Sequence, residues 1–402
     1  MSPQASVLDR VAPALHGERA HVRVAVLADM LEEGWPSMDL VADCLVRELA
    51  SDAALGVHPV LVRPPLVRVS RPWRRGGEVP TRDRVLNRFW LYRRALSAVG
   101  RADLFHIVDH SYAHLASHCA PGRALVTCHD IDAFADYLGT PGQTSGLPSF
   151  LVRRLVAGLR AAALVVCPSE STAAALVDRG LVPRTQLAVV PNGVDVSPVP
   201  TATAVALTRD LLGEREELFL LHVGSTIPRK RLDILLRVFA NVAGAIPDVK
   251  LVRVGGPMTP AQAELARTLG ISDRIVELPP LSRETLAAVY GRAALLLATS
   301  EREGFGLPLA EALAAGVPVI ASDLPVFREV AGDAATYVPL ERTDLWGQAI
   351  LDAIAERADC RESWRRRQAA ARSRGARFSW ASYARQMAVL YREVLARNGT
   401  TA

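Results

Sequence analysis

Residues 293–322, AALLLATSEREGFGLPLAEALAAGVPVIAS, decide the fold that this chain is expected to adopt. The stretch opens with an apolar run (293–298), passes through a short polar loop with glycines, and closes with a second apolar run (317–321). Between the runs, a segment has Pro308 near its start and Gly316 just past its end, which is typical of a helix. The pattern therefore predicts a strand, a helix and a second strand, the repeating unit of an α/β sheet.

Two carboxylates in this unit, Glu303 and Glu311, have seven residues between them. Glu303 follows the first strand and Glu311 lies in the opening turns of the helix, so both can face the crevice where α/β sheets bind ligands. The unpaired amides at the helix start favour an anion, and glycines allow its close approach. A nucleotide-diphosphate sugar combines an anion with hydroxyls. The residues expected to cradle it are Gly304, Phe305, Gly306 and Leu307.

The run 303–322, EGFGLPLAEALAAGVPVIAS, resembles the donor-site signature of the retaining glycosyltransferases of family 4, which has two glutamates with seven residues between them. The resemblance implies an α/β chain of the GT-B fold, with two Rossmann-like domains facing each other across a cleft. Its last helix crosses back to the first domain. The expected limits are 1–200 for the acceptor-side domain, 207–378 for the nucleotide-sugar-binding domain and 379–402 for the crossing helix, with a linker at 197–206. An ordinary strand–loop–helix with solvated or capping carboxylates is the alternative.

A second polar loop follows the apolar run 218–223 and contains the adjacent cations Arg229, Lys230 and Arg231. Positive charge at a helix start opposes the helix dipole, so a bound anion would explain these cations better than helix stability does. The family uses an arginine and a lysine in this loop to contact the donor diphosphate, and the resemblance implies that Lys230 is this lysine. Because Ser225 occupies the usual position of the arginine, Arg229 is expected to replace it. Exposed cations that only solvate the surface are the alternative. Gly255, at the end of another apolar run, is suited to close approach of a ligand to the backbone. The further donor-site positions that we expect are Gly224, Ser225 and Leu281.

Two apolar runs of the N-terminal half end in pairs of polar residues, Asp109–His110 and His129–Asp130. Both pairs would lie at the carboxyl ends of parallel strands and could point into one cleft. Thr127-Cys128-His129 matches a Thr-x-His pattern that the family has on its acceptor side. His129 could hydrogen-bond the transferred sugar or orient the acceptor, and a structural histidine satisfied by the backbone is the alternative. The expected catalytic residues are His129, Arg229, Lys230 and Glu303.

The ten arginines between positions 63 and 94 stand against two acidic residues and have aromatic residues interleaved. A solvated loop and helix face is the first interpretation of such a segment. Contact with an anionic membrane is the second. Nucleic acid is disfavoured, because no recognised binding motif accompanies the arginines.

The composition limits the remaining possibilities. No apolar stretch is long enough to cross a membrane, and residues 1–20 do not resemble a secretory signal. The five cysteines are scattered without zinc or redox spacing, which favours a reducing cytoplasm. The arginine-rich segment makes the inner face of the membrane a second expected location. No metal cluster is apparent. No dinucleotide-binding glycine motif follows the first strand, so we expect no cofactor beyond the co-substrate.

The resemblance implies a retaining enzyme that moves a hexosyl unit from a nucleotide-diphosphate sugar, such as GDP-mannose or UDP-glucose, to an acceptor hydroxyl. Glu311 would grip the ribose hydroxyls, and Glu303 would hold sugar hydroxyls and position the donor. A nucleotide-sugar epimerase or sugar phosphorylase of the same fold is one alternative. A non-catalytic sugar-nucleotide-binding subunit is another. The oligomeric state stays open.

Overall fold

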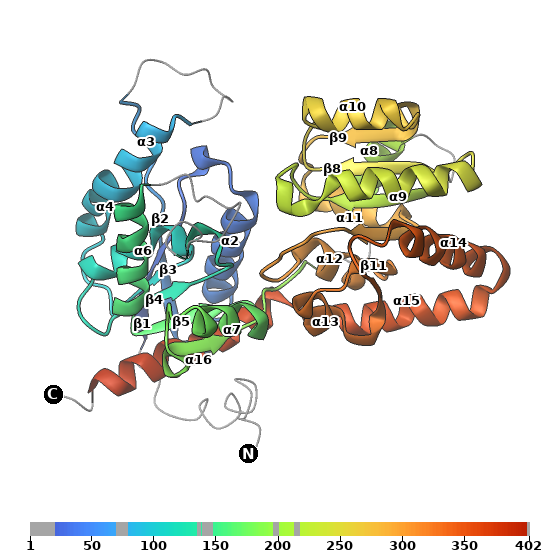
Figure 1. The fold of residues 1–402 in the computed structure, drawn as a ribbon. Coiled ribbons are helices and arrows are strands. Elements are labelled where there is room, and N and C mark those ends of the chain that lie inside the picture. Colours follow the sequence, from blue (N-terminus) through green and yellow to red (C-terminus); the bar gives the residue numbers. More distant parts are fainter. Residues whose placement is uncertain are drawn as a thin grey trace. The chain divides into compact units, whose positions relative to one another are not determined.

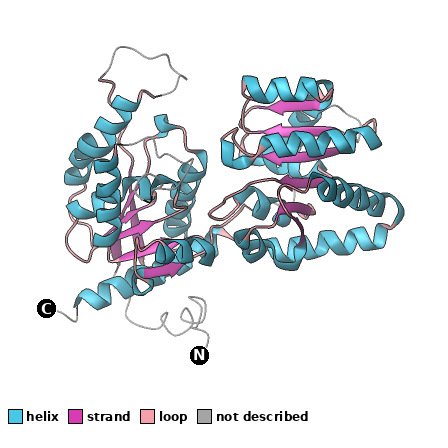
Figure 2. Ribbon diagram, in the orientation of Figure 1, coloured by secondary structure: helices cyan, strands magenta, loops and turns pink. Residues whose placement is uncertain are grey.

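The computed structural model describes residues 21–69, 79–134, 138, 148–195, 201–212 and 218–399. Its internal contacts divide the chain into two compact units (Figure 1). The first unit comprises Met1–Gly193 and Trp380–Ala402, and the second comprises Val194–Ser379. Each unit contains a six-stranded sheet flanked by helices (Figure 2), which confirms the expectation of two Rossmann-like domains.

The first unit is built on a parallel sheet with the order β2-β1-β3-β4-β5-β6. Alternate residues of β1 pack into two different cores, with Ala25 and Leu27 on one face and Val24 and Val26 on the other. Sheets covered on both faces have apolar strands of this kind. The strands are β1 (Val22–Leu27), β2 (Val57–Val62), β3 (Leu104–Ile107), β4 (Ala124–Thr127), β5 (Leu164–Cys167) and β6 (Leu187–Val189).

The helices of the first unit include one from the far end of the sequence. Helix α16 packs against α2 (Figure 1), and its Tyr391 hydroxyl lies 2.8 Å from His106 Nδ1 on β3. The predicted crossing of the last helix to the first domain is confirmed. The helices are α2 (Pro36–Ser51), α3 (Thr81–Leu86), α4 (Tyr92–Ala98), α6 (Ser149–Ala161), α7 (Glu170–Asp178) and α16 (Trp380–Gly399), with short helices η2 (Leu31–Glu33), η3 (Ala53–Leu55), η4 (Asn87–Leu91), η5 (His110–His118), η6 (Asp132–Phe134) and η7 (Arg184–Gln186).

The second unit is also a parallel sheet, in the order β12-β11-β10-β7-β8-β9. The strand sequence reverses direction between β7 and β10, which makes this position the topological switch point. Open α/β sheets bind ligands beyond the carboxyl ends of the strands at such a point. The strands are β7 (Phe219–Val223), β8 (Lys250–Val254), β9 (Ile275–Leu278), β10 (Leu295–Ala298), β11 (Val319–Ser322) and β12 (Ala335–Val338).

The helices of the second unit begin and end at recognisable signals. Pro308 lies near the start of α12, and Gly316 ends it in the left-handed region at φ 76°, where glycine is favoured. Ser282 caps α11 by accepting a hydrogen bond from the Thr285 amide. The helices are α8 (Ala202–Leu212), α9 (Leu232–Ala245), α10 (Pro260–Thr268), α11 (Arg283–Arg292), α12 (Leu307–Ala315), α13 (Pro325–Ala331), α14 (Thr343–Asp359) and α15 (Arg361–Gly375), with short helices η8 (Pro228–Lys230), η9 (Ser272–Arg274) and η10 (Gly332–Ala334).

Two regions differ from their predicted character. The stretch expected to be a linker, 197–206, contains the start of α8, which packs on α11, while residues 196–200 lie outside the described residues. In the arginine-rich segment, residues 70–78 also lie outside them. Arg88 is 5% exposed and Phe89 1%, so the interpretation of the segment as a solvated surface is wrong at these two positions.

Candidate active site

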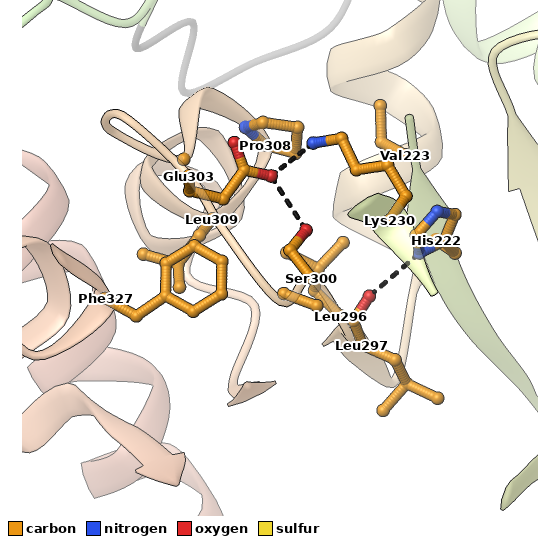
Figure 3. A pocket seen from close by; sticks show the side chains of 12 residues that line it. His222, Val223, Lys230, Leu296, Leu297, Ser300, Glu303, Pro308, Leu309 and Phe327 are labelled. Atoms are coloured by element: carbon orange, nitrogen blue, oxygen red, sulfur yellow. Dashed lines mark hydrogen bonds and ion pairs between the residues drawn. The ribbon is translucent and has the colours of Figure 1, made fainter. Parts of the chain in front are cut away.

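A hollow lies at the switch point of the second sheet, where β7 and β10 end (Figure 3). Three elements supply its polar side chains: His222 comes from β7, Lys230 comes from η8, and Ser300 and Glu303 come from the loop between β10 and α12. The start of α12 closes one side through Gly306 and Pro308. The structure therefore brings a cation, a carboxylate and a helix start together at the position predicted for the donor.

Glu303 is the centre of the polar contacts in this hollow. Its carboxylate accepts a hydrogen bond from Ser300 Oγ at 2.8 Å and forms an ion pair with Lys230 (Figure 3). A second ion pair joins it to Arg229 at 3.1 Å. Burial alone would raise the pKa of Glu303, but Lys230 and Arg229 outweigh burial and hold the pKa below its usual range. Glu303 is thus an ionised carboxylate shared between two cations.

Backbone contacts hold the cation loop against the glutamate loop. The Glu301 amide donates to the Arg229 carbonyl at 2.9 Å, and Thr299 Oγ1 donates to the Lys230 carbonyl at 3.0 Å. These hydrogen bonds to the backbone carbonyls of Arg229 and Lys230 hold both residues beside Glu303 without involving their charged side chains. Arg231 differs, since its guanidinium contacts Asp233 at 2.9 Å and carboxylates at Glu301 and Glu341. Only two of the three adjacent cations therefore contact Glu303.

Glu311, the second carboxylate of the motif, lies on the second turn of α12. The Tyr290 hydroxyl from α11 donates to its Oε2 at 2.9 Å. Burial raises the pKa of Glu311 from 4.5 to about 7, with a further contribution from Asp195, although Tyr290 and Arg283 act in the opposite direction. The two motif carboxylates thus have opposite electrostatic environments. Glu303 is ionised among cations, whereas the pKa of Glu311 is raised to about 7.

In the glycine loop before α12, one residue contributes its side chain to the core, and another is required for its backbone conformation. Phe305 is 4% exposed and packs edge-to-face on Phe378 with ring centroids 5.5 Å apart, so its side chain belongs to the core and only its backbone can contact a donor. Gly306 has φ 88°, and a Cβ there would lie 2.7 Å from Phe327 Cε1. Gly306 is therefore required both by its backbone conformation and by Phe327.

The other donor-site glycines and Ser225 occupy less uniform positions. Gly224 ends β7, and a Cβ on it would lie 3.6 Å from Lys230 Cε, so it borders the cation. Gly255, by contrast, has φ 131°, and a Cβ there would lie 2.4 Å from the Gly224 carbonyl oxygen. The close approach predicted for a ligand at Gly255 is one that the protein's own backbone makes. Ser225 is exposed, and Leu281 packs against the core beside α12.

His222 is a residue of the hollow that the sequence interpretation missed. It is 2% exposed, and its Nδ1 lies 3.2 Å from the Leu297 carbonyl (Figure 3). Because a carbonyl only accepts, Nδ1 carries the hydrogen, and Nε2 is a lone-pair acceptor with no partner among the described residues. Burial, with Arg253 second, lowers the pKa of His222 to about 3, so the ring is neutral. A polar residue near the end of an apolar strand was the signal.

The predicted acceptor-side residues lie together at the carboxyl ends of β3 and β4 in the first unit. His110 Nδ1 lies 3.1 Å from Asp109, and its Nε2 lies 3.6 Å from Asp130. The His129 amide donates to His110 Nδ1 at 3.3 Å. His129 Nε2 lies 2.7 Å from the Val108 carbonyl, and burial lowers the pKa of His129. The contact between the His129 ring and the backbone agrees with the structural alternative for that nitrogen.

A second polar cluster of the first unit was also missed. Glu33 forms a 2.5 Å ion pair with Arg88 and accepts a hydrogen bond from the Tyr112 hydroxyl at 2.9 Å. Asp29 lies beside them after β1 and is 1% exposed. Asp29 follows an apolar run just as Asp109 and His129 do, so the same strand-end signal would have found it.

Within the ranges that the structure describes, no group of three or more His, Cys, Asp or Glu side chains is placed to hold a metal ion. No helix in the same ranges is long and apolar enough to cross a membrane.

Two Rossmann-like units, one with cations, carboxylates and a helix start at its switch point, define the GT-B class of protein. The family model described as "Glycosyl transferases group 1" matches residues 208–374, and "Glycosyltransferase Family 4" matches residues 41–198. The chain belongs to the GT-B glycosyltransferases related to family 4.

Relatives of known name match part of the chain. The D-inositol 3-phosphate glycosyltransferase of Mycobacteroides abscessus is 32% identical over 216 residues, which are 52% of this chain and 46% of that protein. The enzyme of the same name from Mycolicibacterium smegmatis is 34% identical over 229 residues, 54% of this chain and 50% of that protein. The chain thus spans about half the length of these relatives.

Solved structures match nearly the whole chain at lower identity. Sucrose-phosphate synthase from Thermosynechococcus elongatus has a TM-score of 0.73 and 22% identity, covering 94% of this chain and 100% of that one. HepE from Anabaena, in complex with UDP and glucose, has a TM-score of 0.68 and 16% identity, covering 92% of this chain and 99% of that one. These similarities show the fold.

Proposed function

We propose that the chain transfers a hexosyl unit from a nucleotide-diphosphate sugar to an acceptor hydroxyl, with retention of the anomeric configuration. The observation that carries the proposal is the grouping of Lys230, Arg229 and Glu303 at the start of α12, on the switch point of the second sheet. Cations beside the start of a helix suit a diphosphate, and a carboxylate suits the hydroxyls of its sugar.

The residues divide the work of transfer between them. Lys230, Arg229 and the amides near Gly306 stabilise the diphosphate as it departs with a growing negative charge. Glu303 holds sugar hydroxyls, and Glu311 accepts hydrogen bonds from the ribose. His129 and its neighbours orient the acceptor, which attacks from the face of the leaving group. A metal ion is not needed, since protein cations neutralise the diphosphate, and we expect activity to persist in EDTA.

Similarity to solved structures supports the class of donor that we propose, but not its base or sugar. HepE, the structural relative noted above, has been solved with UDP-glucose, and that supports a nucleotide-sugar donor here. UDP-glucose and GDP-mannose are the two donors we propose to test first. The acceptor carries a free hydroxyl, and the relatives with inositol phosphate in their names make polyols the first class to screen.

Thermal unfolding with GDP, UDP, ADP and dTDP, each with its common sugars, tests the donor site, with NAD as control. A ligand present at 100 times its dissociation constant stabilises the folded state by about 2.7 kcal/mol. We expect a shift with one base only, lost in Lys230→Ala. A shift with NAD alone, or with none of the panel, would contradict the proposal.

Turnover then separates transfer from its alternatives. Release of the nucleotide diphosphate that depends on a hydroxyl acceptor supports the transferase. A non-catalytic subunit would bind the donor without transfer or hydrolysis under any acceptor mixture. An epimerase would change the sugar without releasing the nucleotide, and a pyridoxal-dependent phosphorylase would show the absorbance of its cofactor.

We also propose a cytoplasmic location, with the inner face of the membrane as a contact surface. Arg82, Arg93 and Arg94 are exposed near Trp90, which is 45% exposed. Basic side chains beside an interfacial tryptophan suit anionic lipid. Flotation with phosphatidylserine vesicles should retain the protein, and phosphatidylcholine vesicles should not. Equal behaviour with both lipids would remove this contact.

A further inference from the structure

Two carboxyl groups meet at the switch point of the first sheet. Strands β1 and β3 are parallel neighbours, with Leu27 opposite Ile107, and the strand order β2-β1-β3 changes direction between them. Asp29 and Asp109 each follow their strand by two residues, so the register places them side by side at its carboxyl end. This is the position in the first unit that corresponds to the donor hollow in the second.

The two carboxyls have unequal partners. Asp109 accepts a hydrogen bond from the Ser111 amide at 2.9 Å and another from Ser111 Oγ, and it lies 3.1 Å from His110 Nδ1. Asp29 is 1% exposed, and neither of its carboxylate oxygens accepts a hydrogen bond from an N–H or O–H group in the described part of the chain. Burying an ionised carboxylate without partners costs far more than burying a protonated carboxyl, whose O–H group still needs an acceptor.

We propose that Asp29 carries a proton and donates it in a hydrogen bond to Asp109, which stays ionised as the fixed acceptor for a hydroxyl of the incoming substrate. The second half of this statement rests on the proposed function, and the first half does not. Asp29 is thus a positioning residue, because it acts through Asp109.

The electrostatics agree with this assignment. Burial and then the charge of Asp109 raise the pKa of Asp29 well above its usual range, and a proton on Asp29 allows its hydrogen bond to Asp109. Burial acts on Asp109 in the same direction, but His110, His129 and Arg88 outweigh it and lower the pKa of Asp109 to about 2.

Among the residues that the structure describes, the groups packed around Asp29 do not supply it with a counter-ion of its own. The positive charge of Arg88 from η4 acts to lower the pKa of Asp29, but Arg88 already forms the 2.5 Å ion pair with Glu33 of η2. The Tyr112 hydroxyl of η5 donates to Glu33, and the Tyr92 hydroxyl of α4 donates to backbone carbonyls. The proton on Asp29 is therefore what neutralises it.

This arrangement constrains the substrate. An ionised Asp109 accepts hydrogen bonds and repels anions at close range. The part of the acceptor that reaches Asp109 is therefore an uncharged, hydroxyl-bearing group such as a sugar or polyol ring, with any phosphate directed elsewhere.

Infrared spectroscopy tests the proton without any need for activity. The protonated-carboxyl band at pH 7 is compared between Glu311→Gln and Glu311→Gln/Asp29→Asn, since Glu311 also titrates near neutrality. We expect the double variant to lose one carboxyl from the band. An unchanged band overturns the proposal. If the double variant does not fold, carbon-13 NMR of aspartate-labelled wild-type protein decides, because it must show one protonated aspartate at pH 7.

Kinetics test the link to the acceptor once transfer is observed. Asp29→Ala should raise the acceptor KM at least about 10-fold with little change in the donor KM, and Asp29→Asn should restore it to within about 3-fold, because an amide also donates to Asp109. Asp109→Asn should raise the acceptor KM without rescue. Equal defects in Asp29→Ala and Asp29→Asn would overturn the kinetic half. No transfer by wild-type protein refutes the proposed function and leaves the infrared result standing.

Discussion

Lys230 and Glu303, 73 residues apart in the sequence, form an ion pair at the switch point of the second sheet. The carboxylate that is proposed to hold the sugar also neutralises the cations that are proposed to hold the diphosphate. In donor binding, the diphosphate must therefore replace the Glu303 carboxylate as the partner of these cations. The cations for the diphosphate and the carboxylate for the sugar are both in place before the donor binds.

Lys230→Ala should reduce kcat/KM for transfer by about 10²-fold, the loss typical of removing one group that stabilises transition-state charge. Arg267→Ala is the matched control, since its side chain is 68% exposed in the same unit and should leave transfer unchanged. Glu303→Gln should bind the donor nucleotide at least as tightly as wild type, because it frees two cations, while kcat falls. Near-normal turnover in Lys230→Ala would remove the lysine from the mechanism.

Glu311 predicts a pH-dependent stability. Its pKa is raised from 4.5 to about 7, so between these values the folded state binds more protons than the unfolded state. The free energy of unfolding should therefore fall as pH rises from 4.5 to 7, by about 2–4 kcal/mol relative to Glu311→Gln. Urea denaturation of both proteins across this range measures the difference. Parallel curves would show that folding does not raise the pKa of Glu311.

Gly306→Ala should destabilise the protein more than Gly270→Ala does. Both glycines have positive φ, 88° and 68°, but only Gly306 faces a side chain, while a Cβ at Gly270 meets nothing within 4 Å. Backbone strain costs about 1–3 kcal/mol at either position, and overpacking adds a similar amount at Gly306. Phe327→Leu in the Gly306→Ala background should recover part of the loss. Equal costs at both glycines would show that Phe327 moves aside freely.

Arg88→Met should lower the free energy of unfolding by about 3–5 kcal/mol, because it leaves the Glu33 carboxylate buried without a counter-ion. Adding Glu33→Gln should recover part of this loss. Arg94→Ala, at an exposed arginine six residues away, should change stability by less than about 0.5 kcal/mol. If both arginine variants were equally mild, the buried ion pair would carry no stability.

The local parts of the fold followed from the sequence. The strand, helix and strand expected over residues 293–322 are β10, α12 and β11, because Pro308, Gly316 and the apolar runs act on their own neighbourhood. The pairing of Lys230 with Glu303 was also within reach, since strand ends at one edge of a parallel sheet converge.

What could not be predicted depends on contacts between distant segments. Phe305 lies in a glycine loop, and only the position of Phe378 makes it a core residue. Arg88 belongs to a basic segment, and only Glu33, 55 residues earlier, makes it a buried one. The close approach at Gly255 requires the backbone of Gly224. Composition and periodicity do not contain these pairings.

Helix α16 has a consequence for the order in which the chain is completed. Its Trp380, Tyr383 and Tyr391 belong to the same core as Val41 and Leu45 of α2, and the second unit lies between them in the sequence. A ribosome therefore makes the entire second unit before it delivers the helix that covers this core. During synthesis the first unit therefore lacks the helix that covers this apolar face until the second unit has been made.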